Sequence, residues 1–161
     1  MNAGKPVQVS VIGAGSCGEE LEKIAERIGE LLAEKGCIIV NGGRGGVMEA
    51  VSRGASRKGG IVVGVLPDRS EGNPYLTVRL KTNLGHARNV IIAQSGDVVI
   101  AVGGSYGTIS EMAIALKEGK KVVAVKPPVV LKGVTIAETA EEAVEKALNT
   151  LKALLEKGEN C

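Results

Sequence analysis

Residues 97–117, DVVIAVGGSYGTISEMAIALK, join an apolar run to a helical pattern through a glycine-rich turn. Val98–Val102 has the length and composition of a buried strand, and apolar residues recur behind it at the spacing of a helix, at Ile109, Met112 and Leu116. A strand, a turn and a helix in this order place the turn at the carboxyl end of the strand, where open parallel sheets bind their ligands. The stretch therefore predicts both an α/β fold and the position of a site.

Two interpretations of this turn stay open. The first N–H groups of a helix have no acceptors within the helix and lie at the positive end of its dipole, so residues 103–108 predict a phosphate-binding segment. The sequence from Thr108 to Glu111, TISE, is also a capping box. In a capping box the threonine caps the helix and the glutamate accepts a hydrogen bond from the threonine N–H, with no ligand involved.

Strand and helix patterns alternate along the rest of the chain. The predicted strands cover residues 8–12, 38–40, 61–66, 98–102 and 121–125, with a weaker one at 76–80. The predicted helices include 47–56, 84–95 and 139–157, and another precedes Gly36. Side-chain caps are expected from Ser16 with Glu19, from Asn83, and from Thr139 with Glu142. Too few residues separate 76–80 from the preceding strand for us to expect a parallel crossover there. The alternation predicts a single Rossmann-like α/β domain over residues 1–161, with its core at about 7–157, a mainly parallel sheet and helices on both faces.

Two further glycine loops follow predicted strands. The first is Gly13-Ala14-Gly15-Ser16-Cys17-Gly18, a G-x-G-x-x-G sequence, but the next strand does not end in the acidic residue that holds a dinucleotide ribose. That strand ends instead in Asn41-Gly42-Gly43-Arg44-Gly45-Gly46. The two loops predict a ligand held from both sides by Gly13, Gly15, Ser16, Gly42, Gly43, Arg44, Gly45 and Gly46. The alternative is that the glycines only allow tight turns and close packing, with Arg44 in solvent.

Composition excludes several classes of function. The net charge is +2, the basic residues are dispersed among glutamates, and the chain has neither Phe nor Trp, so we expect no nucleic-acid partner. No apolar run reaches the ~20 residues of a membrane span and no signal-peptide pattern begins the chain, so we expect no membrane partner and a cytoplasmic protein. Cys17, Cys37, Cys161 and the single histidine, His86, fit neither a disulfide framework nor a metal site.

Three stretches together resemble the LOG-like, or lysine-decarboxylase-like, Rossmann family. They are NGGRGGVMEA (41–50), LGHARNVIIAQSGDVVIAVGG (84–104) and GGSYGTISE (103–111). With LPD, NPY and TNLGHARN between them, the chain is most similar to the branch that includes the molybdenum-cofactor carrier proteins. The resemblance covers nearly all of residues 7–150.

The resemblance implies a phosphorylated nucleotide-type ligand and a homo-oligomer. Characterised LOG members hydrolyse nucleoside 5′-monophosphates to the free base and ribose 5-phosphate, which implies catalytic roles for Arg88 and Glu111. The implied phosphate-binding residues are Gly104, Ser105, Gly107 and Thr108, and Tyr106 lies between them in sequence. No lysine suits a pyridoxal Schiff base, and no cofactor is expected.

The sequence departs from the family pattern at two places. Gly103-Gly104-Ser105 stands where the family has PGG, and Asn89 stands where it has a lysine. The alternative function is therefore a non-catalytic binder or carrier of a phosphorylated cofactor such as molybdopterin.

Overall fold

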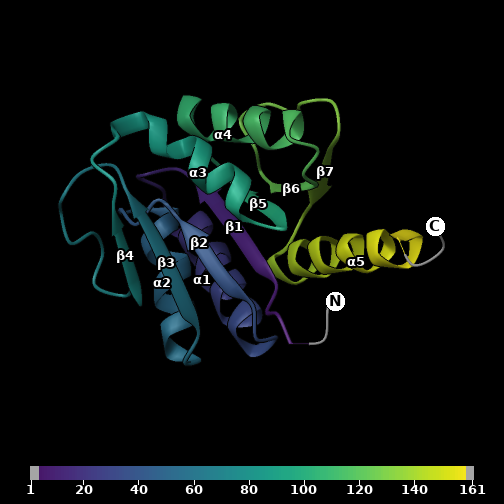
Figure 1. The fold of residues 1–161 in the computed structure, drawn as a ribbon, viewed down its shortest axis with the longest axis horizontal. Helices are drawn as coiled ribbons and strands as arrows, with labels where there is room; N and C mark the ends of the chain where they lie inside the picture. Colours follow the sequence, from purple (N-terminus) through teal and green to yellow (C-terminus); the bar gives the residue numbers. More distant parts are fainter. Residues whose placement is uncertain (1–3, 159–161) are drawn as a thin grey trace.

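The apolar runs of the chain form a seven-stranded sheet in the computed structural model, which describes residues 4–158 (Figure 1). The sheet order is β4–β3–β2–β1–β5–β6–β7, and every neighbouring pair is parallel. The strands are β1 (Gln8–Gly13), β2 (Ile38–Asn41), β3 (Ile61–Leu66), β4 (Val78–Lys81), β5 (Val98–Val102), β6 (Val122–Val125) and β7 (Val134–Ala137). The helices are α1 (Glu19–Glu34), α2 (Val47–Arg57), α3 (Arg88–Ser95), α4 (Tyr106–Lys117) and α5 (Ala140–Gly158), with a 3₁₀ turn at Gly85–Ala87. The predicted α/β fold is confirmed.

Helices cover both faces of the sheet (Figure 1). The core under α1, α2 and α5 contains Ile28, Leu32 and Val144, and the core under α3 and α4 contains Ile92 and Met112. Every residue of β5 and β6 is buried because these strands lie between the two cores. Aliphatic side chains fill both cores, as the lack of Phe and Trp requires.

The connection between β4 and β5 determines where the site lies. From β1 the chain builds outward through β2, β3 and β4, and then returns to add β5 on the other side of β1. The turns after β1 and β5 therefore lead into helices on opposite faces of the sheet. Such a switch point opens a crevice at the carboxyl ends of the two strands.

The edges of the sheet differ from the sequence predictions. The doubt about a parallel β4 was wrong, because residues 67–77 return in an extended loop and β4 pairs in parallel with β3. The first hydrogen bonds of this pairing join Thr77 to Val62, from Thr77 N–H to Val62 C=O and from Val62 N–H to Thr77 Oγ1. Strand β7 is not among the predicted strands, the last of which is 121–125. β7 is a four-residue edge strand with an exposed Thr135, and so short an element has a weak sequence pattern.

The predicted helix caps have mixed outcomes. Helix α1 begins after Gly18 with no side-chain cap, so the Ser16–Glu19 box does not form. Asn83 does not cap a helix either. It has a left-handed backbone (φ 54°) and precedes the 3₁₀ turn, and α3 starts only at Arg88. The Thr139 cap is confirmed, because Glu142 N–H donates to Thr139 Oγ1 at 3.1 Å, and the Glu142 carboxylate accepts from the N–H of Glu138.

Two of the cysteines lie within the described residues. Cys17 is partly buried and Cys37 is buried, both are free thiols, and burial raises the pKa of each. Cys161 lies outside the described residues. No helix within residues 4–158 is long and apolar enough to span a membrane.

Candidate functional site

The two N-terminal glycine loops pack against each other, backbone to backbone. Val47 N–H donates to Ala14 C=O at 2.9 Å, and Gly46 has φ +61°, where a Cβ would stand 2.3 Å from that same oxygen. A Cβ on Gly13 would stand 2.5 Å from Val102 C=O. Several of the glycines therefore serve close packing, and that packing brings the turns after β1, β2 and β5 together at one edge of the sheet.

Three helices begin at this edge without a side-chain cap. Helices α1, α2 and α4 start after Gly18, Gly46 and Ser105, and none of these residues makes a capping hydrogen bond through its side chain. The capping interpretation of Thr108 and Glu111 is wrong, because α4 starts two residues before Thr108, and both residues lie within the helix with buried side chains. The first-turn N–H groups of α4 are thus left for solvent or for a ligand.

A cavity of about 150 Å³ opens between these turns and the helices on the α3–α4 side of the sheet. It combines an aliphatic floor from β1 with backbone from the glycine turns and polar side chains from α3 and α4. The lining residues are Val11, Ile12, Gly13, Gly15, Gly42, Met48, His86, Arg88, Asn89, Ile92, Ser105, Gly107, Thr108 and Glu111.

Arg88 and Glu111 are the ionisable groups buried in this cavity, each with 8% of its surface exposed. Arg88 Nη1 donates to Asn89 Oδ1, whereas the buried Nε has no hydrogen-bond partner among the described residues. Gly42 leaves room for the guanidinium, since a Cβ at this position would stand 3.0 Å from Arg88 Nη2 and 2.7 Å from Met48 Sδ. The arginine therefore has an unused donor inside the cavity.

The same burial changes the proton affinity of both groups. Desolvation raises the pKa of Glu111 to about 7, against the opposing attraction of the Arg88 charge. Desolvation also lowers the pKa of Arg88, and the charge of Glu111 opposes that change. A carboxyl with a pKa near 7 can both accept and donate a proton at neutral pH, as a general acid or base must.

The structure brings together about half of the residues predicted for the site. The cavity is lined by Gly13, Gly15, Gly42, Arg88, Ser105, Gly107, Thr108 and Glu111. It is not lined by Ser16, Gly43, Arg44, Gly45, Gly46, Gly104 or Tyr106. Of these, Ser16, Arg44 and Tyr106 are exposed, whereas Gly43, Gly46 and Gly104 adopt positive φ and shape the turns. The Arg44 charge still acts on both Arg88 and Asp68, which places it near the cavity.

Sequence reasoning missed the residues that hold the second glycine loop in place. Asn41 is fully buried, its Oδ1 accepts the N–H of Gly43 at 2.7 Å, and its Nδ2 donates to Ser52 Oγ at 2.9 Å. From the other side, Asn73 donates its N–H to Gly43 C=O at 2.8 Å and its Nδ2 to Arg44 C=O at 3.0 Å. The polar loop 68–75 is thus bonded to the glycine loop. An asparagine that ends an apolar strand was the available signal for Asn41.

Other cavity residues had no assigned site role. Asn89 and Ile92 project from α3 and Met48 from α2, and His86 is exposed at the 3₁₀ turn. Asn89 stands where the family has a lysine, and its side-chain Oδ1 accepts a hydrogen bond from Arg88 Nη1.

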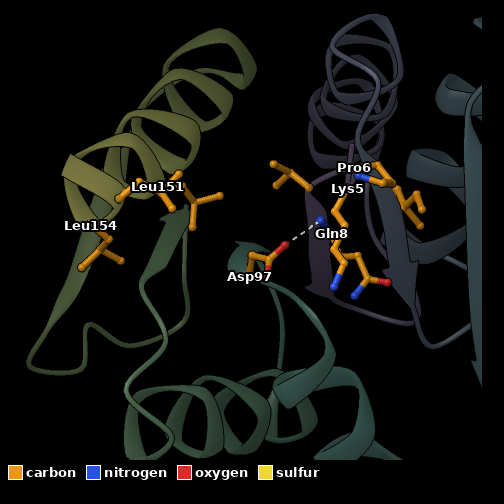
Figure 2. Close-up of a pocket in the computed structure, with 9 residues that line it drawn as sticks. Lys5, Pro6, Gln8, Asp97, Leu151 and Leu154 are labelled. Carbon is orange, nitrogen blue, oxygen red and sulfur yellow. Dashed lines mark hydrogen bonds between the residues drawn. The ribbon is translucent and has the colours of Figure 1, made fainter. Parts of the chain in front are cut away.

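Larger hollows lie at the opposite edge of the sheet, with volumes of about 500 and 660 Å³. Figure 2 shows the first, where Leu151 and Leu154 of α5 face Lys5, Pro6 and Gln8 across a gap. Its carboxylate, Asp97, is engaged by the N–H of Gln8 at 2.9 Å. These hollows are larger, but they lack the convergent buried polar groups of a ligand site, so the smaller cavity is the candidate.

No group of three or more His, Cys, Asp or Glu side chains within residues 4–158 is placed to hold a metal ion.

Comparisons with known proteins agree with the geometry. An "Uncharacterized protein" of Archaeoglobus fulgidus is 56% identical over 91% of this chain and 97% of its own length. A cytokinin riboside 5′-monophosphate phosphoribohydrolase of Rhodococcoides fascians is 33% identical over 58% of this chain, and the match spans only half of that enzyme. The solved structure of the molybdenum cofactor binding protein from Rippkaea orientalis superposes with a TM-score of 0.87 at 32% identity, over 92% of this chain and 99% of that one.

A family model supplies the classification. The model of the SLOG cluster4 family matches residues 6–156, which is nearly the whole chain and includes all three glycine turns, Arg88 and Glu111. The resemblance to LOG-like proteins is therefore confirmed, and the chain belongs to the SLOG cluster4 family.

Proposed function

We propose that the protein binds a phosphorylated, nucleotide-type small molecule in the Arg88–Glu111 cavity and hydrolyses the N-glycosidic bond of a nucleoside 5′-monophosphate. The observation that carries the proposal is the buried Arg88 Nε with no partner, next to a buried carboxyl whose pKa is about 7. A cationic donor is left unpaired inside a protein at a cost of about 1–3 kcal/mol or more, and a bound anion removes that cost.

The phosphate occupies the mouth of the cavity. There the N–H groups at the start of α4, around Gly107 and Thr108, have no side-chain cap and point toward an incoming anion. Ser105 adds a hydroxyl at the same mouth. This leaves the ribose and its glycosidic bond deeper in the cavity, within reach of Glu111.

Hydrolysis requires a group that can accept and donate a proton near neutral pH. The C1′–N bond breaks as positive charge develops on the sugar, and the oxygen of a water molecule bonds to C1′. Glu111 takes the proton from that water and gives it up again to the leaving nitrogen of the base, so the reaction consumes one water and returns the carboxyl to its starting state. Arg88 holds the anionic part of the substrate through its free donor.

A nucleotide panel tests the enzymatic proposal. Incubation with purine and pyrimidine 5′-monophosphates is expected to release free base and ribose 5-phosphate, measured by chromatography. Glu111→Gln keeps the shape of the side chain but not its proton chemistry, so it should lower turnover by about 100-fold or more while leaving nucleotide binding intact. If no nucleotide yields free base at high protein concentration, hydrolysis is rejected.

A second candidate is a carrier of a phosphorylated cofactor such as molybdopterin, for which the bound molecule is cargo. One observation favours it: the similarity to the Rippkaea orientalis protein extends over 99% of that chain, whereas the phosphoribohydrolase matches over half of its length. The phosphate of molybdopterin suits the same uncapped helix start and the same arginine donor.

Gly107 provides a test that both candidates share. A Cβ on Gly107 meets no atom within 4 Å, so Gly107→Leu should fold normally and fill the cavity mouth. The variant is expected to lose stabilisation by AMP or by molybdopterin in thermal unfolding, whereas Lys117→Leu, on the exposed last turn of α4, should keep it. Stabilisation by molybdopterin without base release from any nucleotide would select the carrier. If neither ligand raises the melting temperature of the unmodified protein, both candidates fail.

A further inference from the structure

The side-chain amide of Asn89 is oriented by its neighbour in the cavity. Asn89 has 8% of its surface exposed and lines the cavity from the first turn of α3. Its Oδ1 accepts a hydrogen bond from Arg88 Nη1. A guanidinium group can only donate, so the amide oxygen must face Arg88 and the amide nitrogen must point away from it. The arginine therefore fixes which end of the amide faces the rest of the cavity.

The amide nitrogen of Asn89 is left without a partner. The other two buried asparagines within residues 4–158 both use this atom: Asn41 Nδ2 donates to Ser52 Oγ at 2.9 Å. Asn73 Nδ2 donates to Arg44 C=O at 3.0 Å. Asn89 Nδ2 donates to no residue of the described chain, and its one hydrogen bond is made through Oδ1. Most buried side-chain donors have a partner, so an unpaired amide in a cavity wall indicates a donor available to a ligand.

The size of the cavity decides which part of a ligand this donor reaches. A volume of about 150 Å³ corresponds to roughly five water molecules of ~30 Å³ each. Groups on different walls of so small a space contact the same part of a ligand. Helix α4 packs against α3 (Figure 1), and its uncapped start around Gly107 and Thr108 lines the same cavity. An anion bound at the start of α4 therefore lies within reach of the first turn of α3.

We infer that Asn89 is a further ligand-binding residue, whose Nδ2 donates a hydrogen bond to an oxygen of the ligand's phosphate group. The inference rests on the proposed function, in that the ligand carries a phosphate. An amide suits this place because it accepts from the Arg88 cation through its oxygen and donates to an anion through its nitrogen. An ammonium group could not do both, since it has no acceptor. Asn89 thus contacts the ligand directly, in addition to orienting Arg88.

A titration with inorganic phosphate tests this inference without any nucleotide. Binding is followed by phosphorus NMR at constant ionic strength, and the wild-type protein is expected to bind phosphate. Asn89→Leu keeps a similar shape but has no donor, so it should weaken phosphate binding by at least about 10-fold, as expected for a hydrogen bond to a charged group. Gln94→Leu is the matched control, because it removes an exposed amide of the same helix that does not line the cavity. It should leave the affinity unchanged.

A double-mutant cycle separates a direct contact from an effect that passes through Arg88. In the Arg88→Ala background, Asn89→Leu is expected to weaken phosphate binding further, by at least about 5-fold. If Asn89 acts only by orienting the guanidinium, its substitution has no effect once Arg88 is alanine.

Asn89→Ala gives a second variant in case Asn89→Leu alters the fold, which circular dichroism reports. The inference is overturned if the wild-type protein does not bind phosphate, or if folded Asn89 variants bind it as tightly as the wild type. It is also overturned if the effect of Asn89→Leu disappears in the Arg88→Ala background.

The proposed function has separate outcomes. If phosphate binding depends on Asn89 but neither AMP nor molybdopterin raises the melting temperature, the proposed function fails and the Asn89 contact stands. If AMP stabilises the wild type and both folded Asn89 variants equally, the contact is rejected and ligand binding in the cavity stands.

Discussion

The two edges of the sheet present opposite kinds of hollow. The carboxyl edge has a cavity of about 150 Å³ with a buried arginine, a buried carboxyl and uncapped helix starts. The amino edge has hollows of about 500 and 660 Å³ lined largely by aliphatic side chains and by surface lysines (Figure 2). The contrast shows that volume alone does not identify a site. What distinguishes the carboxyl edge is a buried carboxyl near a buried arginine whose Nε has no hydrogen-bond partner among the described residues.

The same contrast appears in the backbone. Gly13 and Gly46 at the carboxyl edge are required by contacts, because other backbone atoms occupy the space of a side chain. Gly36, beside the larger hollow at the amino edge, has φ +72° but open space around it. Substituting one glycine at each edge therefore separates the cost of disturbing the close packing at the site from the cost of replacing any glycine that has positive φ.

The largest effect is expected from Gly46→Ala, with Gly36→Ala as its match. Both changes place a Cβ on a backbone of positive φ, which costs about 1–3 kcal/mol. Only Gly46 adds a collision with Ala14 C=O, 2.3 Å from the new atom. We expect a loss of at least about 4 kcal/mol in the free energy of unfolding for Gly46→Ala, and about 1 kcal/mol for Gly36→Ala, by urea denaturation. Equal losses would show that the packing of the two glycine loops contributes nothing.

The next largest effect is the pH dependence of stability that Glu111 imposes. Its folded-state pKa of about 7 lies above the ordinary value of 4.5, so the protonated form is favoured by folding. The contribution is fully present below pH 4.5 and is lost as pH rises through 7, by about 3 kcal/mol. Glu111→Gln lacks this loss, so the stability of the wild type should fall relative to the variant between pH 5 and pH 8. Parallel pH curves in chemical denaturation would contradict a desolvated carboxyl at this position.

A smaller effect concerns the ligand. Arg88→Ala removes the unpaired donor and should weaken AMP binding by about 10- to 100-fold, the usual worth of a hydrogen bond to a charged group. Lys5→Ala removes a cation that lines both larger hollows and should leave the affinity unchanged. Calorimetric titration of both variants checks this, and a loss on Lys5→Ala would move the site to the amino edge.

The smallest effect is expected from Asp97→Asn. This carboxylate accepts the N–H of Gln8 in an exposed setting, where such contacts contribute little. We expect a change in melting temperature below about 4 °C and no change in ligand affinity. A large loss of AMP affinity would instead show that the amino and carboxyl edges are coupled through β1 and β5.

Local patterns predicted most of the fold, and the family resemblance predicted the two main candidate site residues. β5 and α4 were visible because an apolar run, a glycine turn and a helical repeat adjoin in sequence. Arg88 and Glu111 came from the family resemblance, and the structure places both in one cavity. The alternation of strands and helices alone could not predict this, because it does not give the order of the strands in the sheet, on which the packing of α3 against α4 depends.

What the sequence did not predict depends on contacts between distant segments. Asn73 and Asn41 hold the second glycine loop from opposite sides, and nothing in either local sequence indicates the other. The capping box at Thr108 looked regular, but the helix begins two residues earlier, so its two side chains turn inward. Short polar side chains that cap helices elsewhere are here buried against a cavity.

Because Gly42 has no side chain, substitutions at this position and at Arg88 are expected to have coupled effects on ligand affinity. An added methyl group would meet only the movable ends of Arg88 and Met48, so the fold should tolerate Gly42→Ala while the guanidinium is pushed aside. In a double-mutant cycle, Gly42→Ala should therefore cost most of the ligand affinity in the presence of Arg88 and almost none once Arg88 is alanine. Such epistasis means that substitutions which preserve the arginine itself can still remove its function.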